Sequence, residues 1–327
     1  MESPTLIVHR DIIGRFVRLH EHNRLAHAYL FVGPRDIGKH QTALGVAKWV
    51  NCESSAKSHD YFCDQCSSCL KINNGNHPDV HVLDVEAGES IKIENIRELL
   101  SQIKLRPFFA ERKIFILKNI EVMTDEGANA LLKTLEEPTA SSLLLLTTSV
   151  PENVLDTVKS RCHTIHFFPT DHEALAQDLI KHYDEDAFKA HFFAYYSHGA
   201  FGQALKLREG NFFERKNVII DKFMLSVQPN DAFVKEVLAD KVKTKEFLDV
   251  LLSWIRDAFL VKAGLDDGRL IHLDRLKDLK NFAMRLSFDD LVSLNKEMIG
   301  MSKMLAENLN LKIPLLIIKE RLYGTNH

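Results

Sequence analysis

The sequence lacks any long apolar run and carries little net charge. No apolar run in its 327 residues reaches the roughly 18 residues that a membrane-spanning helix needs. The formal net charge is −3, so a strongly basic surface that holds DNA without help is not expected. The first ten residues lack the basic flank and apolar stretch of a signal peptide, and we expect a cytoplasmic protein with no membrane contact.

Cysteine is also scarce, with five residues in the whole chain. Four of them are clustered as C-x10-C-x2-C-x2-C, at Cys52, Cys63, Cys66 and Cys69. Because two thiolates separated by two residues reach one tetrahedral ion through a tight turn, the set predicts a structural zinc site in a reducing compartment. Free thiols in a surface excursion are the alternative, and the spacing does not say whether such a module contacts nucleic acid or protein.

Short apolar runs alternate with helical patterns over about the first 168 residues. The candidate strands are 28–32, 80–85, 114–117, 143–148 and 164–168. Near-continuous apolar runs are typical of strands covered on both faces. Alternation of strand and helix predicts an α/β fold in which a parallel sheet lies between helices.

The rest of the chain has helical patterns with no strands between them. Because 327 residues exceed one ordinary core, we expect two or three domains, and the patterns along the chain favour three. They are an α/β domain at 1–169 with the zinc module at about 50–72, a small helical domain at 170–210 and a helical C-terminal domain at 211–327. Pro314 is expected to begin the last helix.

The segment GPRDIGKH, which starts at Gly33, is close to the phosphate-loop pattern G-x-x-x-x-G-K-[ST]. Gly33, Gly38 and Lys39 fit the pattern and can supply backbone N–H groups and an ammonium for phosphates. His40 stands where a hydroxyl would bind Mg²⁺, and Asp36 would repel a triphosphate. We therefore expect a glycine-bounded turn that joins a strand to a helix and has no catalytic role, with weak ATP binding or none.

Six features together resemble one family. They are LAHAYLFVGP from residue 25, the four cysteines, NHPDVHVLD, SIKIENIREL, NALLKTLEEP and SRC, and they span about residues 10–170. They are similar to delta-prime subunits of the bacterial DNA polymerase III clamp loader. The resemblance implies an AAA+ fold, with a parallel five-stranded domain, a small helical lid and a C-terminal collar domain that holds a five-subunit ring. It implies gamma/tau and delta subunits as partners, and the sliding clamp and primed DNA through the complex.

The resemblance also implies that the nucleotide site has lost its chemistry. After the strand IFIL, an ATPase of this family has Asp-Glu for Mg²⁺ and the attacking water, and here Lys118 and Asn119 follow. The lid position that supplies an Arg aligns with Gly202. Without these groups the main electrostatic terms of phosphoryl transfer are missing. We expect no ATPase of its own from this chain, which would be a non-catalytic subunit of the DNA-directed DNA polymerase III holoenzyme.

Arg161, in SRC, is the residue by which the resemblance implies a remaining catalytic role. In clamp loaders it reaches across the subunit interface to the γ-phosphate held by a neighbour, which requires a planar, permanently charged guanidinium. The alternative is an Arg paired with a local carboxylate or capping a helix.

Two other functions remain open. The first is an ATP-hydrolysing gamma/tau-type subunit, which His40, Lys118 and Asn119 disfavour. The second is a zinc-bearing nucleic-acid-binding protein on an inactive AAA+ scaffold, which the acidic balance disfavours.

Overall fold

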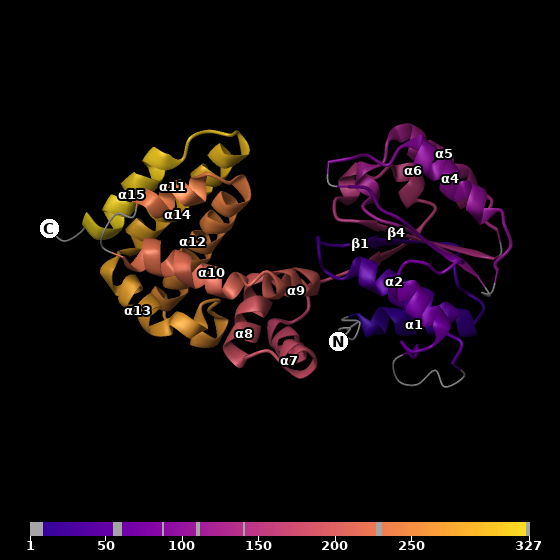
Figure 1. Cartoon of the computed structure of the whole chain (residues 1–327), viewed down its shortest axis with the longest axis horizontal. Coiled ribbons are helices and arrows are strands. Elements are labelled where there is room, and N and C mark those ends of the chain that lie inside the picture. Colours follow the sequence, from indigo (N-terminus) through magenta and orange to yellow (C-terminus); the bar gives the residue numbers. More distant parts are fainter. Residues whose placement is uncertain are drawn as a thin grey trace. The chain divides into compact units, whose positions relative to one another are not determined.

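A computed structural model describes the chain over residues 9–54, 61–86, 88–108, 112–139, 141–226 and 231–324 (Figure 1). Its contacts divide it into two compact units. The first unit ends at Thr170 and also takes in Ala200–Gly202. The second comprises Asp171–Gly199 and the chain from Gln203 onward.

The first unit combines strands with helices. Its strands are β1 (Ala28–Val32), β2 (Val80–Leu83), β3 (Lys113–Leu117), β4 (Ser142–Thr148) and β5 (His163–His166). Its helices are α1 (Arg10–Glu21), α2 (Lys39–Asn51), α3 (Ser67–Asn73), α4 (Ile93–Ile103), α5 (Asp125–Glu136) and α6 (Asp156–Lys159), with 3₁₀ turns η1 (Ile120–Val122) and η2 (Pro151–Asn153).

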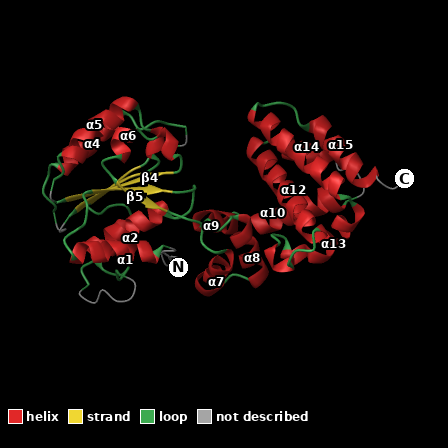
Figure 2. Cartoon of the chain, turned by 180° about the vertical axis from the view of Figure 1, so that it is seen from behind, coloured by secondary structure: helices red, strands yellow, loops and turns green. Residues whose placement is uncertain are grey.

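The five strands form one parallel sheet in the order β2-β3-β4-β1-β5. Every residue of β1, β3 and β4 is buried, because helices cover both faces of the sheet. One face packs Phe31 and Leu145 against α1 and α2, and the other packs Leu30 and Leu144 against α4 and α5 (Figure 2). The predicted α/β class with a five-stranded parallel sheet between helices is confirmed.

The two edge strands differ from the prediction. β5 is exposed at His163 and Thr164, and in β2 only Val80 is buried while Val82 is exposed. Each pairs with only one neighbour, β5 with β1 and β2 with β3, so full coverage on both faces was the wrong expectation for them. Both also end two residues before the predicted bounds of 80–85 and 164–168.

Two segments that carry predicted site residues leave the same edge of this sheet, next to a third segment that carries Ser149. Strands β1, β4 and β3 are neighbours and run parallel, so their carboxyl ends lie side by side. The phosphate-loop segment follows β1, Lys118 and Asn119 follow β3, and Ser149 follows β4. Ligand sites in open parallel sheets form at this edge, and the topology therefore brings the predicted nucleotide-site residues together.

The second unit is helical in its described residues. Its elements are α7 (His172–Tyr183), α8 (Ala187–Tyr196), α9 (Phe201–Glu209, whose first two residues belong to the first unit), α10 (Phe212–Ile219), the π-helix η3 (Ile220–Leu225), α11 (Asp231–Leu238), α12 (Lys241–Lys262), η4 (Asp267–Arg269), η5 (Leu273–Arg275), α13 (Leu276–Arg285), α14 (Phe288–Ala306) and α15 (Lys312–Gly324). Leu248, Leu251 and Ile255 of α12 are buried. Pro314 lies in the first turn of α15 but does not begin it, because the helix starts at Lys312.

The predicted lid at 170–210 and collar at 211–327 stay predictions. Among the described residues, no helix combines the length and apolar character needed to cross a bilayer.

Candidate functional site

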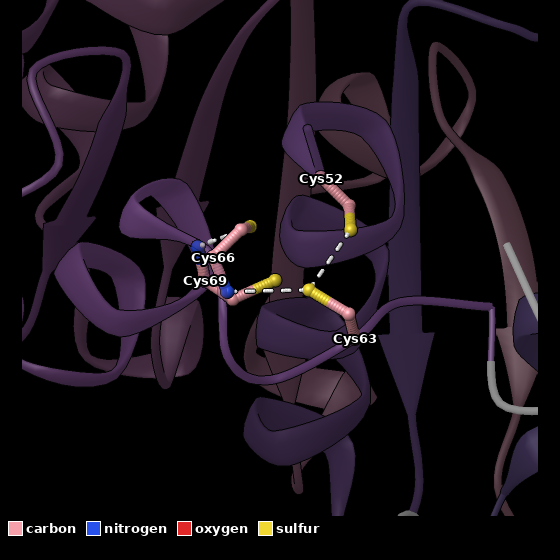
Figure 3. A group of neighbouring side chains, drawn as sticks. All are labelled: Cys52, Cys63, Cys66 and Cys69. Atoms are coloured by element: carbon pink, nitrogen blue, oxygen red, sulfur yellow. Dashed lines mark hydrogen bonds between the residues drawn. The ribbon is translucent and has the colours of Figure 1, made fainter. Parts of the chain in front are cut away.

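The four clustered cysteines lie together at the carboxyl end of α2. Cys52 directly follows α2, Cys66 precedes α3, and Cys69 lies within α3. Their sulfur atoms turn toward one common space, and all four ligand atoms lie within 4.8 Å of one another (Figure 3). The Sγ atoms of Cys52 and Cys63 are 3.6 Å apart. A tetrahedral ion with metal–sulfur bonds of about 2.3 Å requires sulfurs nearly this close, so the set fits one shared metal ion.

Backbone N–H groups already point at these sulfurs. The Cys66 N–H donates to Cys63 Sγ at 3.2 Å, and the Cys69 N–H donates to Cys66 Sγ at 3.4 Å. A hydrogen bond from the Gln65 N–H is the main reason that the pKa of the Cys63 thiol falls to about 7. Burial raises the pKa of the Cys69 thiol, so this sulfur would need a metal ion to stay ionised at neutral pH.

Two ionic side chains hold the cysteine module in place. Lys48 of α2 is fully buried, and its Nζ lies 2.5 Å from Asp64 Oδ1, within the turn between Cys63 and Cys66. Glu53 Oε1 accepts the Ser68 N–H at the start of α3, at 3.1 Å. Both contacts fix the turns that carry the sulfurs, which is the role of the groups around a structural metal site.

The phosphate-loop segment forms a strand-to-helix turn. Gly38 caps α2 in a left-handed conformation with φ 109°, which favours glycine. A Cβ on Gly33 would lie 2.6 Å from the carbonyl oxygen of Phe167. The glycines of the pattern are therefore required by the backbone, whether or not a phosphate binds.

Lys39 is bound to its own chain. Its Nζ donates to the carbonyl oxygens of Gly33 and Pro34, at 2.6 Å each, and to Ser149 Oγ at 3.0 Å. An ammonium group has three N–H donors, and these three contacts occupy them all. The residue is only 6% exposed, and burial lowers the pKa of Lys39 to about 8.

A carboxylate completes this network. Glu121 Oε1 accepts the Ser149 N–H at 3.2 Å, and the charge of Glu121 acts to raise the pKa of Lys39. The loop thus meets protein acceptors where a nucleotide-binding loop would meet phosphate oxygens.

Two of the residues at the predicted Mg²⁺ position also have partners within the chain. Lys118 forms an ion pair with Asp84. Burial, and next the positive charge of Lys118, lower the pKa of His40 to about 4, so the imidazole is neutral at pH 7. Asn119 adopts a left-handed conformation, φ 52°, and its N–H donates to Thr147 Oγ1 at 3.2 Å. A cation and a neutral imidazole stand where Mg²⁺ would need oxygen ligands.

Gly202 belongs to the first unit and lies against the loop. Its N–H donates to the Asp36 carbonyl oxygen at 2.8 Å, and a Cβ at this position would lie 2.8 Å from the same oxygen. No larger side chain fits there without a shift of backbone, so this packing excludes an arginine at the aligned lid position.

Arg161 lies apart from the loop in the sequence, between α6 and β5. Its Nε donates to Glu136 Oε1 at 2.9 Å and its Nη2 lies 2.7 Å from the same oxygen. Its Nη1 donates to the Thr157 carbonyl oxygen at 2.9 Å. The side chain is 35% exposed. The local carboxylate partner is therefore present, and the role across an interface stays a prediction.

Sequence reasoning placed the cysteines, the loop and Arg161 but missed their partners. Ser149 and Glu121 are far from them in the chain and match no motif, and Glu136 lies in NALLKTLEEP but was given no role there. Only the strand order, which sets β4 between β1 and β3, brings Ser149 to Lys39.

Comparisons with known proteins place this arrangement in a family. A family model described as DNA polymerase III, delta subunit matches residues 8–171, and a model of its C-terminal part matches residues 209–323. The chain is 31% identical over 301 residues to DNA polymerase III subunit delta' of Bacillus subtilis, covering 89% of each chain. The chain belongs to the delta-prime family of DNA polymerase III subunits.

By sequence, tau and gamma subunits match about half of this chain. The tau/gamma subunit of Haemophilus influenzae is 35% identical over 157 residues, which are 48% of this chain and 22% of that protein. Among solved structures, a gamma-subunit-related protein of Thermotoga maritima covers 96% of this chain and 99% of its own, at 19% identity and a TM-score of 0.45. The delta-prime match thus extends beyond the segment shared with tau/gamma.

Proposed function

We propose that this chain is the delta-prime subunit of a bacterial clamp loader, acting with gamma/tau and delta subunits to place a sliding clamp on primed DNA. Membership of the delta-prime family supports the assignment. The chain binds ATP weakly or not at all and hydrolyses none. It serves as a ring member whose C-terminal helices form the collar.

The observation that carries the non-catalytic role is the bonding of Lys39. With all three donors held by Gly33, Pro34 and Ser149, a phosphate must displace protein acceptors before it gains this cation. Lys118 cannot bind Mg²⁺, and Asn119 cannot act as a base for the attacking water. An ATP-hydrolysing gamma/tau-type role is therefore disfavoured.

The chemistry that remains is that of Arg161 toward a nucleotide held by the neighbouring subunit. Its guanidinium makes four contacts within its own chain, through Nε, Nη1 and Nη2, of which the contact to Ser160 Oγ is long at 3.3 Å. Guanidinium has five N–H donors, so at least one stays available for a phosphate oxygen. A finger of this kind stabilises charge that develops in the transition state.

The cysteine module binds zinc in this proposal. Four thiolates with no open position are the donor set of structural zinc sites, and the observed spacing of the sulfurs fits such a site. The purified chain should contain one zinc per molecule by elemental analysis, and a Cys63→Ser, Cys66→Ser double variant should contain none. Equal zinc in both proteins would reject the site.

Reconstitution tests the function. Clamp loading onto primed DNA is measured with gamma/tau, delta and clamp, with and without this chain, while the isolated chain is assayed for ATPase. We expect loading only when the chain is present and no ATPase above background from the chain alone. Loading that proceeds equally well without the chain would contradict the assignment, and turnover by the chain that Lys39→Met abolishes would contradict the non-catalytic role.

A further inference from the structure

Glu136 is the carboxylate that Arg161 contacts, and no motif assigns it a role. It is the last residue of α5, a helix anchored in the core by the buried Leu131 and Leu135. Arg161 follows α6, which has only four residues. The contact therefore ties a side chain that follows a short helix to the end of a well-packed helix.

The contact holds one part of the guanidinium and leaves another available. Both Nε and Nη2 meet the same oxygen, Glu136 Oε1, at 2.9 and 2.7 Å. Nη1 is held from a second direction by the Thr157 carbonyl oxygen at 2.9 Å. The second N–H of Nη2 takes no part in these contacts, and the Nη1 contact to Ser160 Oγ is long at 3.3 Å and easily exchanged. A phosphate oxygen can bind there while Glu136 stays in place.

The pair has little value for stability. Its side chains are 35% and 50% exposed, and exposed ion pairs contribute little to folding because water and salt screen them. Its main effect is on the conformation of Arg161, a side chain with several rotatable bonds that would otherwise sample many rotamers.

We propose that Glu136 is a positioning residue for the Arg161 finger. This inference rests on the proposed function of Arg161. The carboxylate fixes the guanidinium before the neighbouring subunit docks, so that less conformational entropy is lost when the finger engages the nucleotide. Glu136 itself touches neither the nucleotide nor the reacting atoms.

The test compares variants of this chain within the reconstituted complex. Glu136→Ala should lower the turnover number of the neighbour's ATPase about three- to ten-fold, the effect of releasing one side chain, with KM for ATP unchanged. Glu136→Gln keeps an oxygen acceptor for Nε and Nη2 and should restore most of the lost turnover. Glu137→Ala is the matched control, because this exposed carboxylate is one residue further on and the hydrogen bonds and ion pair of Arg161 go to Glu136, Thr157 and Ser160 instead, so turnover should be unchanged.

Arg161→Ala separates the two levels of the proposal. If Arg161→Ala lowers turnover but Glu136→Ala leaves it unchanged or raises it, the positioning role is wrong and the finger stands. If Arg161→Ala itself has no effect, the finger and its positioning residue are both rejected. The double variant Arg161→Ala, Glu136→Ala should match Arg161→Ala alone, since Glu136 acts only through the finger, and an additional loss in the double variant would contradict that route.

Discussion

The phosphate-loop segment and the segment around Arg161 both present a cation, but they differ in how that cation is held. Lys39 is 6% exposed and has all three donors engaged within its own chain. Arg161 is 35% exposed and keeps a donor for an incoming group. A cation in the right motif is useful to a ligand only when its donors are free, and by this measure the first site is closed and the second open.

The largest expected effect on stability comes from the cysteine module, which lies at the other end of α2 from the phosphate-loop segment. Helix α2 joins the two, since it begins after Gly38 and ends before Cys52. Replacing Cys63 by Ser should cost about 4–5 kcal/mol of unfolding free energy, as expected when a structural metal is lost. Denaturant unfolding with and without a zinc chelator measures it. If the chelator leaves the stability of the wild type unchanged, the module holds no metal that matters to the fold.

Lys39 should matter for stability rather than for activity. Lys39→Met leaves the buried acceptors Gly33 O, Pro34 O and Ser149 Oγ without their donor, which costs about 1–3 kcal/mol. Urea denaturation of the isolated chain at neutral pH provides the value. A variant as stable as the wild type would mean that the loop is not held closed by these bonds.

His40 should make the closed site sensitive to acid. Its pKa is about 4 in the folded chain and about 6.5 when unfolded, so the unfolded chain binds the additional proton as the pH falls from 6.5 toward 4. Stability is therefore lost over this window, by about 1–2 kcal/mol between pH 7 and pH 5. His40→Thr should flatten this part of the pH profile. Parallel profiles for the two proteins would show that His40 is not buried in the neutral form.

The smallest effect on stability is expected at the open site, around Arg161. Arg161→Ala should change the unfolding free energy by no more than about 0.5 kcal/mol, because the pair with Glu136 is exposed. The same urea titrations supply the comparison with Lys39→Met. A loss as large as that of Lys39→Met would indicate that Arg161 is a structural residue.

The sheet was predictable because its central strands are apolar throughout. Runs such as AYLFV and LLLLTT are typical of strands that are buried on both faces. Their alternation with helical patterns predicted the parallel α/β class. The exposure of the edge strands was not predictable in the same way. His163 and Thr164 are exposed because β5 is the last strand in the sheet order.

The candidate sites were predictable where residues close in sequence share one function. Spacing found the cysteines, and the loop pattern found Lys39. The partners that decide what these residues do lie at long separations: Ser149 is 110 residues from Lys39, and Glu136 is 25 from Arg161. Such pairs follow from the topology of the sheet and the packing of α5 and α6, which no local pattern encodes.

The most direct measurement is the ATPase of the reconstituted clamp loader containing either Arg161→Ala or Lys39→Met in this chain. Arg161→Ala should reduce hydrolysis at the neighbouring site by about 10³-fold, the usual effect of removing an arginine finger, although the variant chain folds normally. Lys39→Met should leave hydrolysis unchanged although it destabilises the chain. The reverse result, with activity lost from Lys39→Met and retained in Arg161→Ala, would show that the chain works on its own nucleotide and contradict the proposed function.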